Sequence, residues 1–144
     1  TPFSLRLVGP VTDDGWRSRP WTSAAGSVPQ RELAREFRSA HCLVLPSRND
    51  SYGMVVAEAL ATGMPAIVSD MVGAKDLVVP GRTGWVVPHG DANALAERLL
   101  ECATSPDVLA AMAPACREVA LTATWDAYAE RFVALCRQIV ETPA

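Results

Sequence analysis

Four short apolar runs, separated by segments with helical patterns, constrain the fold of this chain more than any other feature. The runs are LRLVG (5–9), HCLVLPS (41–47), PAIVSD (65–70) and TGWVVP (83–88). Their apolar residues are consecutive and do not alternate with polar ones, which is typical of parallel strands covered on both faces. The sequence therefore predicts an α/β fold with a doubly wound parallel sheet.

The segments between and after these runs predict helices. Apolar residues recur at helical spacing within 29–40, 53–62, 90–103, 106–120 and 125–141. Asp91 is suited to cap the start of one helix, and Pro29 suits the first turn of another. The aromatic stripe from Trp125 to Val140 is interpreted as a packing surface. Residues 10–29 show no clear period, so we expect them to form a loop around the domain.

Composition restricts the function classes. The 144 residues suit one domain, and the net charge of -3, with arginines spread along the chain, argues against nucleic acid as a partner. No apolar run is long enough to span a bilayer, and the first residues lack a signal-peptide pattern, so we expect a cytoplasmic protein. The four cysteines show no metal-ligand spacing and are interpreted as core thiols.

One acid stands in an otherwise apolar helix, in the stretch NDSYGMVVAEALATGMP (49–65). An unpaired buried carboxylate is costly, so Glu58 must face water, find a partner in the protein, or bind a ligand. In open parallel sheets, ligands bind beyond the carboxyl ends of the strands, which directs attention to the loops at 47–53 and 69–82. The backbone amides of Tyr52, Gly53 and Met54 would form an anion site at the helix start, suited to a phosphate.

Glu58 lies just over one turn into this helix and can reach back toward its start. Its two oxygens match a vicinal pair of ribose hydroxyls. Asp50, on the other side of the same phosphates, would reach a different hydroxyl-bearing group. The alternative is that Glu58 lies on a wet helix face and Asp50 merely caps the helix, and spacing alone does not distinguish the two.

The stretch PSRNDSYGMVVAEALATGMPAIVSD (46–70) resembles the nucleotide-sugar site of retaining glycosyltransferases with the GT-B fold, specifically family 4. The Rossmann-like carboxyl-terminal domain of this family carries two acids separated by seven residues, and here the pair is Asp50 and Glu58. The resemblance extends through VGAKDLVVPGRTGWVVPHGDANALAERL and through GSVPQRELAREFRSAHCLVLPS, so it covers nearly the whole chain.

The resemblance implies a role for each site residue. Glu58 would hold the donor ribose, and Asp50, the catalytic candidate, would contact hydroxyls of the donor sugar. Asp50 is one methylene shorter than the glutamate usual in the family. The other implied donor contacts are the amides of Ser51, Tyr52, Gly53 and Met54 at the diphosphate, the turn of Gly26, Ser27 and Val28 near the base, and Gly73 with Ala74 lining the pocket. Lys75 is interpreted as a solvated loop charge.

The resemblance also implies what the chain lacks. LRLVG matches the second strand of the family's carboxyl-terminal domain, so we expect the first strand-helix unit, with its Arg/Lys loop, and the acceptor domain to be absent. The expected function is donor binding in a hexosyltransferase with an unknown acceptor, such as a sugar, a lipid or a small molecule. We expect no metal or other cofactor, and no activity for this part alone. Helix 125–141 is expected to pack toward the missing domain, and the full-length protein could be membrane-peripheral.

Two alternatives to the transferase remain open from the sequence. A nucleotide-sugar epimerase or a phosphorylase uses the same two-domain fold. A non-catalytic α/β module that binds a nucleotide or a protein partner would explain the absent Arg/Lys loop and the shortened acid at position 50.

Overall fold

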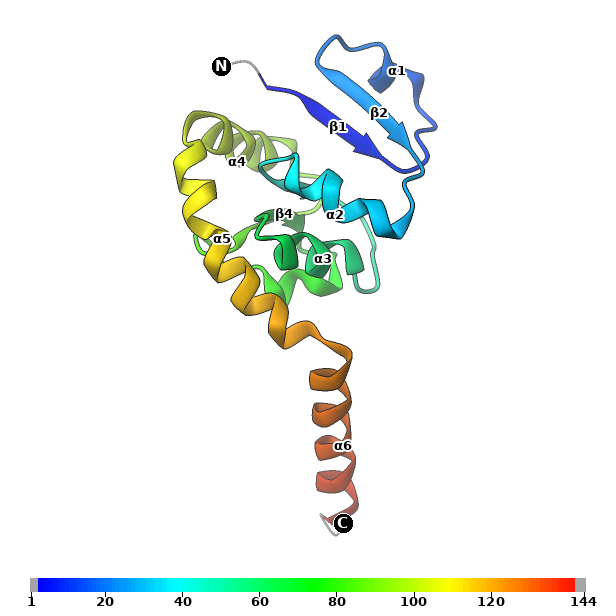
Figure 1. The fold of residues 1–144 in the computed structure, drawn as a ribbon, viewed down its shortest axis with the longest axis vertical. Helices are drawn as coiled ribbons and strands as arrows, with labels where there is room; N and C mark the ends of the chain where they lie inside the picture. The colour runs from blue at the N-terminus through cyan, green and yellow to red at the C-terminus, as the bar shows by residue number, and fades with distance from the viewer. Residues whose placement is uncertain (1–2, 142–144) are drawn as a thin grey trace.

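The computed structural model describes residues 3–141, which form short parallel strands and surrounding helices (Figure 1). The predicted α/β fold is confirmed, because every ladder between the strands is parallel. In chain order, with η marking 3-10 helices, the elements are β1 (Leu5–Val8), α1 (Asp14–Arg17), β2 (Thr22–Gly26), α2 (Gln30–Arg38), β3 (Leu43–Leu45), α3 (Met54–Thr62), β4 (Ala66–Ser69), η1 (Gly73–Leu77), β5 (Gly84–Val87), α4 (Ala92–Thr104), α5 (Pro106–Ala120), η2 (Leu121–Ala123) and α6 (Trp125–Glu141).

The strands form two sheets, β1-β2 and β3-β4-β5. Within residues 3–141 no ladder joins β1 to β3. A doubly wound sheet with the strand order 3-2-1-4-5-6 contains both arrangements, with β2-β1 at positions 3-2 and β3-β4-β5 at positions 4-5-6. The two sheets therefore match the two sides of one such sheet, on either side of its strand 1 position.

The expectation of a loop throughout residues 10–29 was wrong. Residues 22–26 form β2, which pairs in parallel with β1, and residues 14–17 form a single helical turn. The pairing is extended by two backbone hydrogen bonds of 2.8 Å, from Leu5 N to Trp21 O and from Gly9 N to Gly26 O. The small residues TSAAG carry no apolar run, so backbone pairing with β1, a long-range contact, determines this strand.

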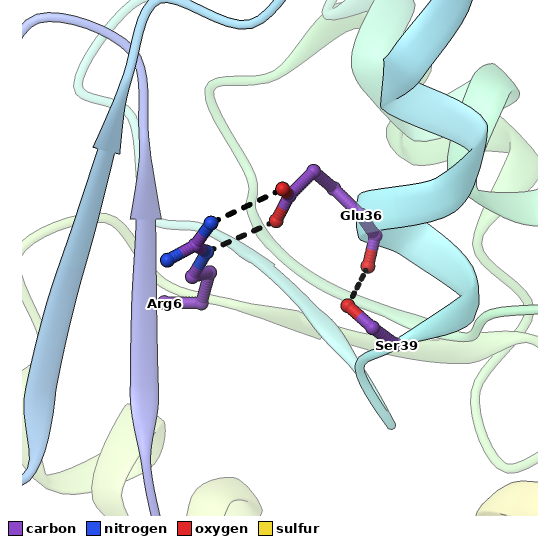
Figure 2. Close-up of polar contacts among 3 residues, drawn as sticks. All are labelled: Arg6, Glu36 and Ser39. Atoms are coloured by element: carbon purple, nitrogen blue, oxygen red, sulfur yellow. Dashed lines mark hydrogen bonds and ion pairs between the residues drawn. The ribbon is translucent and has the colours of Figure 1, made fainter.

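An ion pair connects β1 to α2 (Figure 2). The Arg6 guanidinium donates to both oxygens of Glu36, at 3.0 and 3.1 Å, and the Ser39 hydroxyl donates to the Glu36 carbonyl at 2.8 Å. Hydrogen bonding to Arg6 is the main cause that lowers the pKa of Glu36, and the same bonds raise the pKa of Arg6. The pair is thus a solvent-exposed side-chain contact between β1 and α2.

The main core lies between the three-stranded sheet and helices α3 and α5. All four residues of β4 are buried, and Val56, Leu60 and Cys116 from the two helices join the same cluster. A smaller cluster of Phe37, Ala59 and Met64 packs α2 against α3. Helix α3 is therefore enclosed on several sides, which fixes the position of its amino-terminal end.

Thr83 supplies a buried polar link beside β5. Its side chain is fully buried, and its hydroxyl accepts a hydrogen bond from Val79 N at 2.7 Å and donates one to Leu77 O at 3.0 Å. The buried hydroxyl thus bonds one backbone group at the end of η1 and one in the segment that leads to β5.

Three of the four cysteines match the prediction of core thiols. Cys116 is buried, and Cys42 and Cys102 pack against the main core. Burial raises the pKa of Cys116 to about 11. The Cys42 thiol donates to Leu43 O at 3.3 Å, and its interaction with Cys102 is the main cause that raises the pKa of Cys42 and lowers that of Cys102. The prediction was wrong for Cys136, which is exposed because it lies on α6, away from the core.

Helix α6 extends away from the rest of the molecule (Figure 1). Trp125, Tyr128 and Phe132 follow each other at helical spacing, with neighbouring ring centroids 6.1 Å apart. All three rings are more than half exposed, and no residue of α6 is buried. The predicted aromatic stripe is thus present, and nothing in residues 3–141 covers it.

Candidate functional site

The two loops at the carboxyl ends of β3 and β4 lie against each other. Asp50 N donates to Met71 O at 3.1 Å, and Gly73 N donates to Asp50 O at 3.1 Å. A third bond, 2.5 Å long, runs from Ala74 N to Tyr52 O. The segments that contain the two predicted clusters, 50–54 and 73–74, are therefore parts of one backbone-bonded unit.

Two glycines permit this arrangement. A Cβ on Gly73 would overlap the carbonyl oxygen of Ser51, so only glycine allows the loops to approach this closely. Gly53 precedes α3 with a φ of 82°, in the left-handed region that favours glycine. A Cβ there would also lie 2.7 Å from a methyl carbon of Val72. Both glycines thus act through the backbone.

The amino-terminal end of α3 offers backbone donors. The N-cap Gly53 has no side chain to bond them, and the first helical bond runs from Val56 N to Gly53 O at 2.9 Å. The amides at the preceding positions lack partners within the helix, and the helix dipole places partial positive charge there. Ser51, Tyr52 and Met54 are exposed beside this end. The arrangement can accept an anion from solvent.

Asp50 takes part in the loop itself. Its Oδ1 accepts a hydrogen bond from Tyr52 N at 3.2 Å, and the residue is half-buried. The helix start is Gly53, so Asp50 stabilises the turn before the helix and is not the helix cap. The Tyr52 amide, one of the predicted diphosphate donors, is bonded to this carboxylate.

Glu58 is half-buried and has a partner in the protein. Its Oε1 accepts a hydrogen bond of 2.5 Å from the amide Nε2 of Gln30, the first residue of α2. Of the three alternatives for this acid, a protein partner is the one that the structure shows. Because the partner is a neutral amide, it does not cancel the charge of the carboxylate.

The third predicted segment follows β2. Gly26 has a φ of 69°, Ser27 is exposed and Val28 is half-buried. Gln30 lies two positions after Val28, so its bond to Glu58 brings this turn toward α3. The contact was not anticipated from the sequence, because the two residues are 28 positions apart and no local pattern relates them.

The remaining predicted residues differ in their surroundings. Gly73 is exposed, whereas Ala74 belongs to the main core and is 1% exposed, so its methyl group does not line the surface. The exposed Lys75 extends its ammonium to Asp70 O at 2.7 Å. Within residues 3–141, no group of three or more His, Cys, Asp or Glu side chains is placed to hold a metal ion. Among the helices of residues 3–141, none combines the length and the apolar character that a membrane-spanning segment requires.

Two surface hollows, of about 340 and 210 Å³, lie away from these residues. The larger is lined by Asp13, Gly15, Trp16, Arg19 and Trp21 around α1. The smaller lies among α2, α3 and α5 near Met64. Neither hollow is lined by the candidate-site residues.

The parallel strands and the helices between them place this protein in the class of Rossmann-like α/β domains. The family described as "Glycosyl transferases group 1" matches residues 22–119. The chain belongs to this family.

Relatives and solved structures agree with the family. The chain is 39% identical over 99 residues to D-inositol 3-phosphate glycosyltransferase of Streptomyces scabiei, a match over 69% of this chain and 22% of that protein. Sucrose-phosphate synthase of Thermosynechococcus elongatus superimposes with a TM-score of 0.72 at 31% identity, over 83% of this chain and 30% of that one. An Anabaena protein, Alr3699/HepE, solved with UDP, has the same fold, with a TM-score of 0.72 at 19% identity over 96% of this chain and 40% of that one. The match with the Streptomyces relative spans about a fifth of its length.

Proposed function

We propose that this chain is the donor-binding part of a retaining glycosyltransferase that uses a nucleoside diphosphate sugar. The observation that carries the proposal is the position of Glu58. It is a half-buried acid one turn behind the free amides of α3, and a neutral side chain holds it. An anion site beside a charged hydroxyl acceptor is the arrangement that a nucleoside diphosphate requires.

Each predicted residue has a role in this proposal. The α3 amides bind the diphosphate, and Glu58 accepts hydrogen bonds from the ribose hydroxyls. Asp50, in the bonded loop that precedes α3, contacts hydroxyls of the transferred hexose-type sugar. Ser27 and Val28 lie on the base side, and Gly73 keeps the second loop close enough to complete the edge. Ala74 contributes through its backbone.

Two comparisons support a sugar nucleotide as the donor. The Anabaena protein of similar fold was solved with UDP and also with UDP-glucose. The Streptomyces relative is named as a glycosyltransferase, which favours transfer over epimerisation or phosphorolysis. Product analysis on the full-length protein distinguishes these three reactions.

The transfer reaction requires groups that the rest of the full-length protein must contribute. Cleavage of the sugar-phosphate bond develops negative charge on the diphosphate, and each fixed donor at such a charge typically contributes about 10²- to 10³-fold in rate. We propose that helix amides, together with cationic groups outside this chain, neutralise the charge without a metal ion. The acceptor, whether a sugar, a lipid or a small molecule, would bind a further domain against which α6 packs with its aromatic stripe.

The division into two sheets supports this domain organisation. The strand 1 position between β1 and β3 is the place where the first strand-helix unit of the family would lie. We propose that a segment elsewhere in the full-length protein supplies this strand. It would join the two sheets into one and present its own loop at the same edge as α3.

Calorimetric titration of the full-length protein with UDP, GDP and ADP, and with the matching nucleosides, tests the proposal. We expect one diphosphate to bind more tightly than its nucleoside, with EDTA making no difference. Glu58→Gln should weaken binding by about 1 to 3 kcal/mol, the range for unpaired hydrogen-bonding groups. Glu97→Gln, on the exposed face of α4, is the matched control. Equal binding by the parent and Glu58→Gln would overturn the ribose role.

A further inference from the structure

The Gln30–Glu58 bond is the side-chain contact between α2 and α3 that reaches the candidate site. Gln30 is exposed at the start of α2, so packing does not hold its side chain in place. Its amide nevertheless lies 2.5 Å from Glu58 Oε1. We propose that Gln30 is a positioning residue of the donor site, which fixes the Glu58 carboxylate in the orientation that accepts the ribose hydroxyls. This inference rests on the proposed function of Glu58.

The chemistry of the pair suits this role. A carboxylate offers about four lone-pair sites, and one amide donor occupies one of them. The other sites stay available for hydroxyl donors, and the full negative charge is kept. An arginine in the same place would bond both oxygens and cancel the charge. The single neutral donor of Gln30 therefore orients the Glu58 carboxylate and leaves its other lone pairs free to accept hydrogen bonds.

The framework behind the pair is rigid enough for positioning. Phe37 from α2 packs with Ala59 and Met64 in the smaller core cluster, and the half-buried Leu33 and Val55 pack against it. Ala59 is the residue next to Glu58. The packing between α2 and α3 is therefore adjacent to the Gln30–Glu58 hydrogen bond. Without the Gln30 amide, the carboxylate would rotate about its own side-chain torsions, and a ligand would have to order it.

The position of Gln30 in the chain gives the bond a further consequence. Gln30 lies two residues after Val28, in the segment proposed to lie near the base. Movement of that turn would move the amide that orients Glu58. Gln30 thus links the base side of the site to its ribose side, and recognition of the ribose should depend on it more than recognition of the phosphates does.

The test uses the full-length protein and the best-bound of UDP, GDP and ADP, compared with its 2′-deoxy counterpart. We expect the parent to prefer the ribonucleotide. Gln30→Ala should lower the affinity for the ribonucleotide by about three- to ten-fold, the effect of one net hydrogen bond, and change that for the deoxynucleotide by less than about two-fold. Arg31→Ala, its exposed neighbour on α2, should leave both affinities unchanged.

A double variant separates this inference from the proposed function. If Gln30 acts through Glu58, Gln30→Ala should add no further loss to Glu58→Gln. Additive losses, an equal loss for both nucleotides, or no loss in Gln30→Ala would overturn the positioning role while Glu58→Gln still weakens binding. If Glu58→Gln itself has no effect, the ribose role of Glu58 fails first, and the role of Gln30 fails with it.

Discussion

Replacing Gly53 by alanine tests how the amino-terminal end of α3 is held. The residue has φ and ψ of 82° and 56°, and a Cβ would lie 2.7 Å from Val72 Cγ1 and 3.4 Å from Leu45 Cδ2. Both neighbours are packed, Val72 fully, so neither can move freely. The substitution therefore combines backbone strain with overpacking.

Both contributions can be estimated. A residue with a Cβ in the left-handed region costs about 1 to 2 kcal/mol, and overpacking a core typically costs about 1 to 3 kcal/mol. The expected loss of unfolding free energy for Gly53→Ala is therefore about 2 to 5 kcal/mol. Gly63, at the other end of the same helix, has a similar φ of 88°. A Cβ there meets the flexible end of Arg117 and lies 3.2 Å from Ala113 Cβ, where a shift of a few tenths of an ångström suffices. Gly63→Ala should therefore lose less, about 1 to 2 kcal/mol for its backbone conformation.

Urea denaturation followed by circular dichroism compares the two variants directly. Equal losses, or a larger loss in Gly63→Ala, would refute the argument that the neighbours of Gly53 are rigid. The nucleotide affinity of the two folded variants, measured by titration without urea, gives a second comparison. Gly53→Ala should weaken diphosphate binding because it displaces the first amides of α3, whereas Gly63→Ala should bind like the parent.

Three further predictions follow from buried and paired groups. Thr83→Val removes the buried hydroxyl that bonds Val79 N and Leu77 O, so unfolding free energy should fall by about 1 to 3 kcal/mol. Thr83→Ser keeps both bonds and should lose only about 0.8 kcal/mol for its methyl group. A denaturation midpoint for Thr83→Val at or above that of Thr83→Ser would contradict this. Iodoacetamide at pH 8, followed by peptide mapping, should modify the exposed Cys136 first and the buried Cys116 much more slowly, because burial raises the pKa of Cys116 to about 11; comparable rates for these two thiols would show that Cys116 is accessible. The pair with Arg6 lowers the pKa of Glu36 from its ordinary value of 4.5. The pair therefore stabilises the fold fully above about pH 4.5. This stabilisation is lost as the pH falls through the lower pKa that Glu36 has in the folded state. The difference in thermal midpoint between the parent and Glu36→Gln should therefore shrink on acidification, and a constant difference would exclude a role for the charge.

The sequence allowed most elements to be predicted, because their signals are local. Every residue of β4 is apolar or small and buried, and Asp91 accepts hydrogen bonds from Asn93 N and Ala94 N as an N-cap should. The helix 125–141 was predicted, and α6 runs from Trp125 to Glu141, the last residue that the structure describes. Strand β2 was missed, since its small and partly exposed residues become a strand only through pairing with β1.

The sequence predicted which loops form the candidate site, but it did not predict the contacts among the side chains there. The strand-end rule and the lone Glu58 located the edge, and the two loops do meet there. The bond from Gln30 and the burial of Ala74 depend on how α2 and η1 pack, which no short pattern in the sequence encodes. The bond from Asp50 to Tyr52 N is local, and an Asx turn could have been proposed for it from the spacing.

The separation of β1 from β3 also affects the tendency of this chain to self-associate in solution. Within residues 3–141, each of these strands has one side whose backbone N–H and C=O groups form no ladder. Such edges can pair with strands of other copies of the chain. Concentrated samples of this chain should therefore self-associate by pairing of their strand edges. A short synthetic β-strand peptide that fits between them should suppress that association and improve solubility.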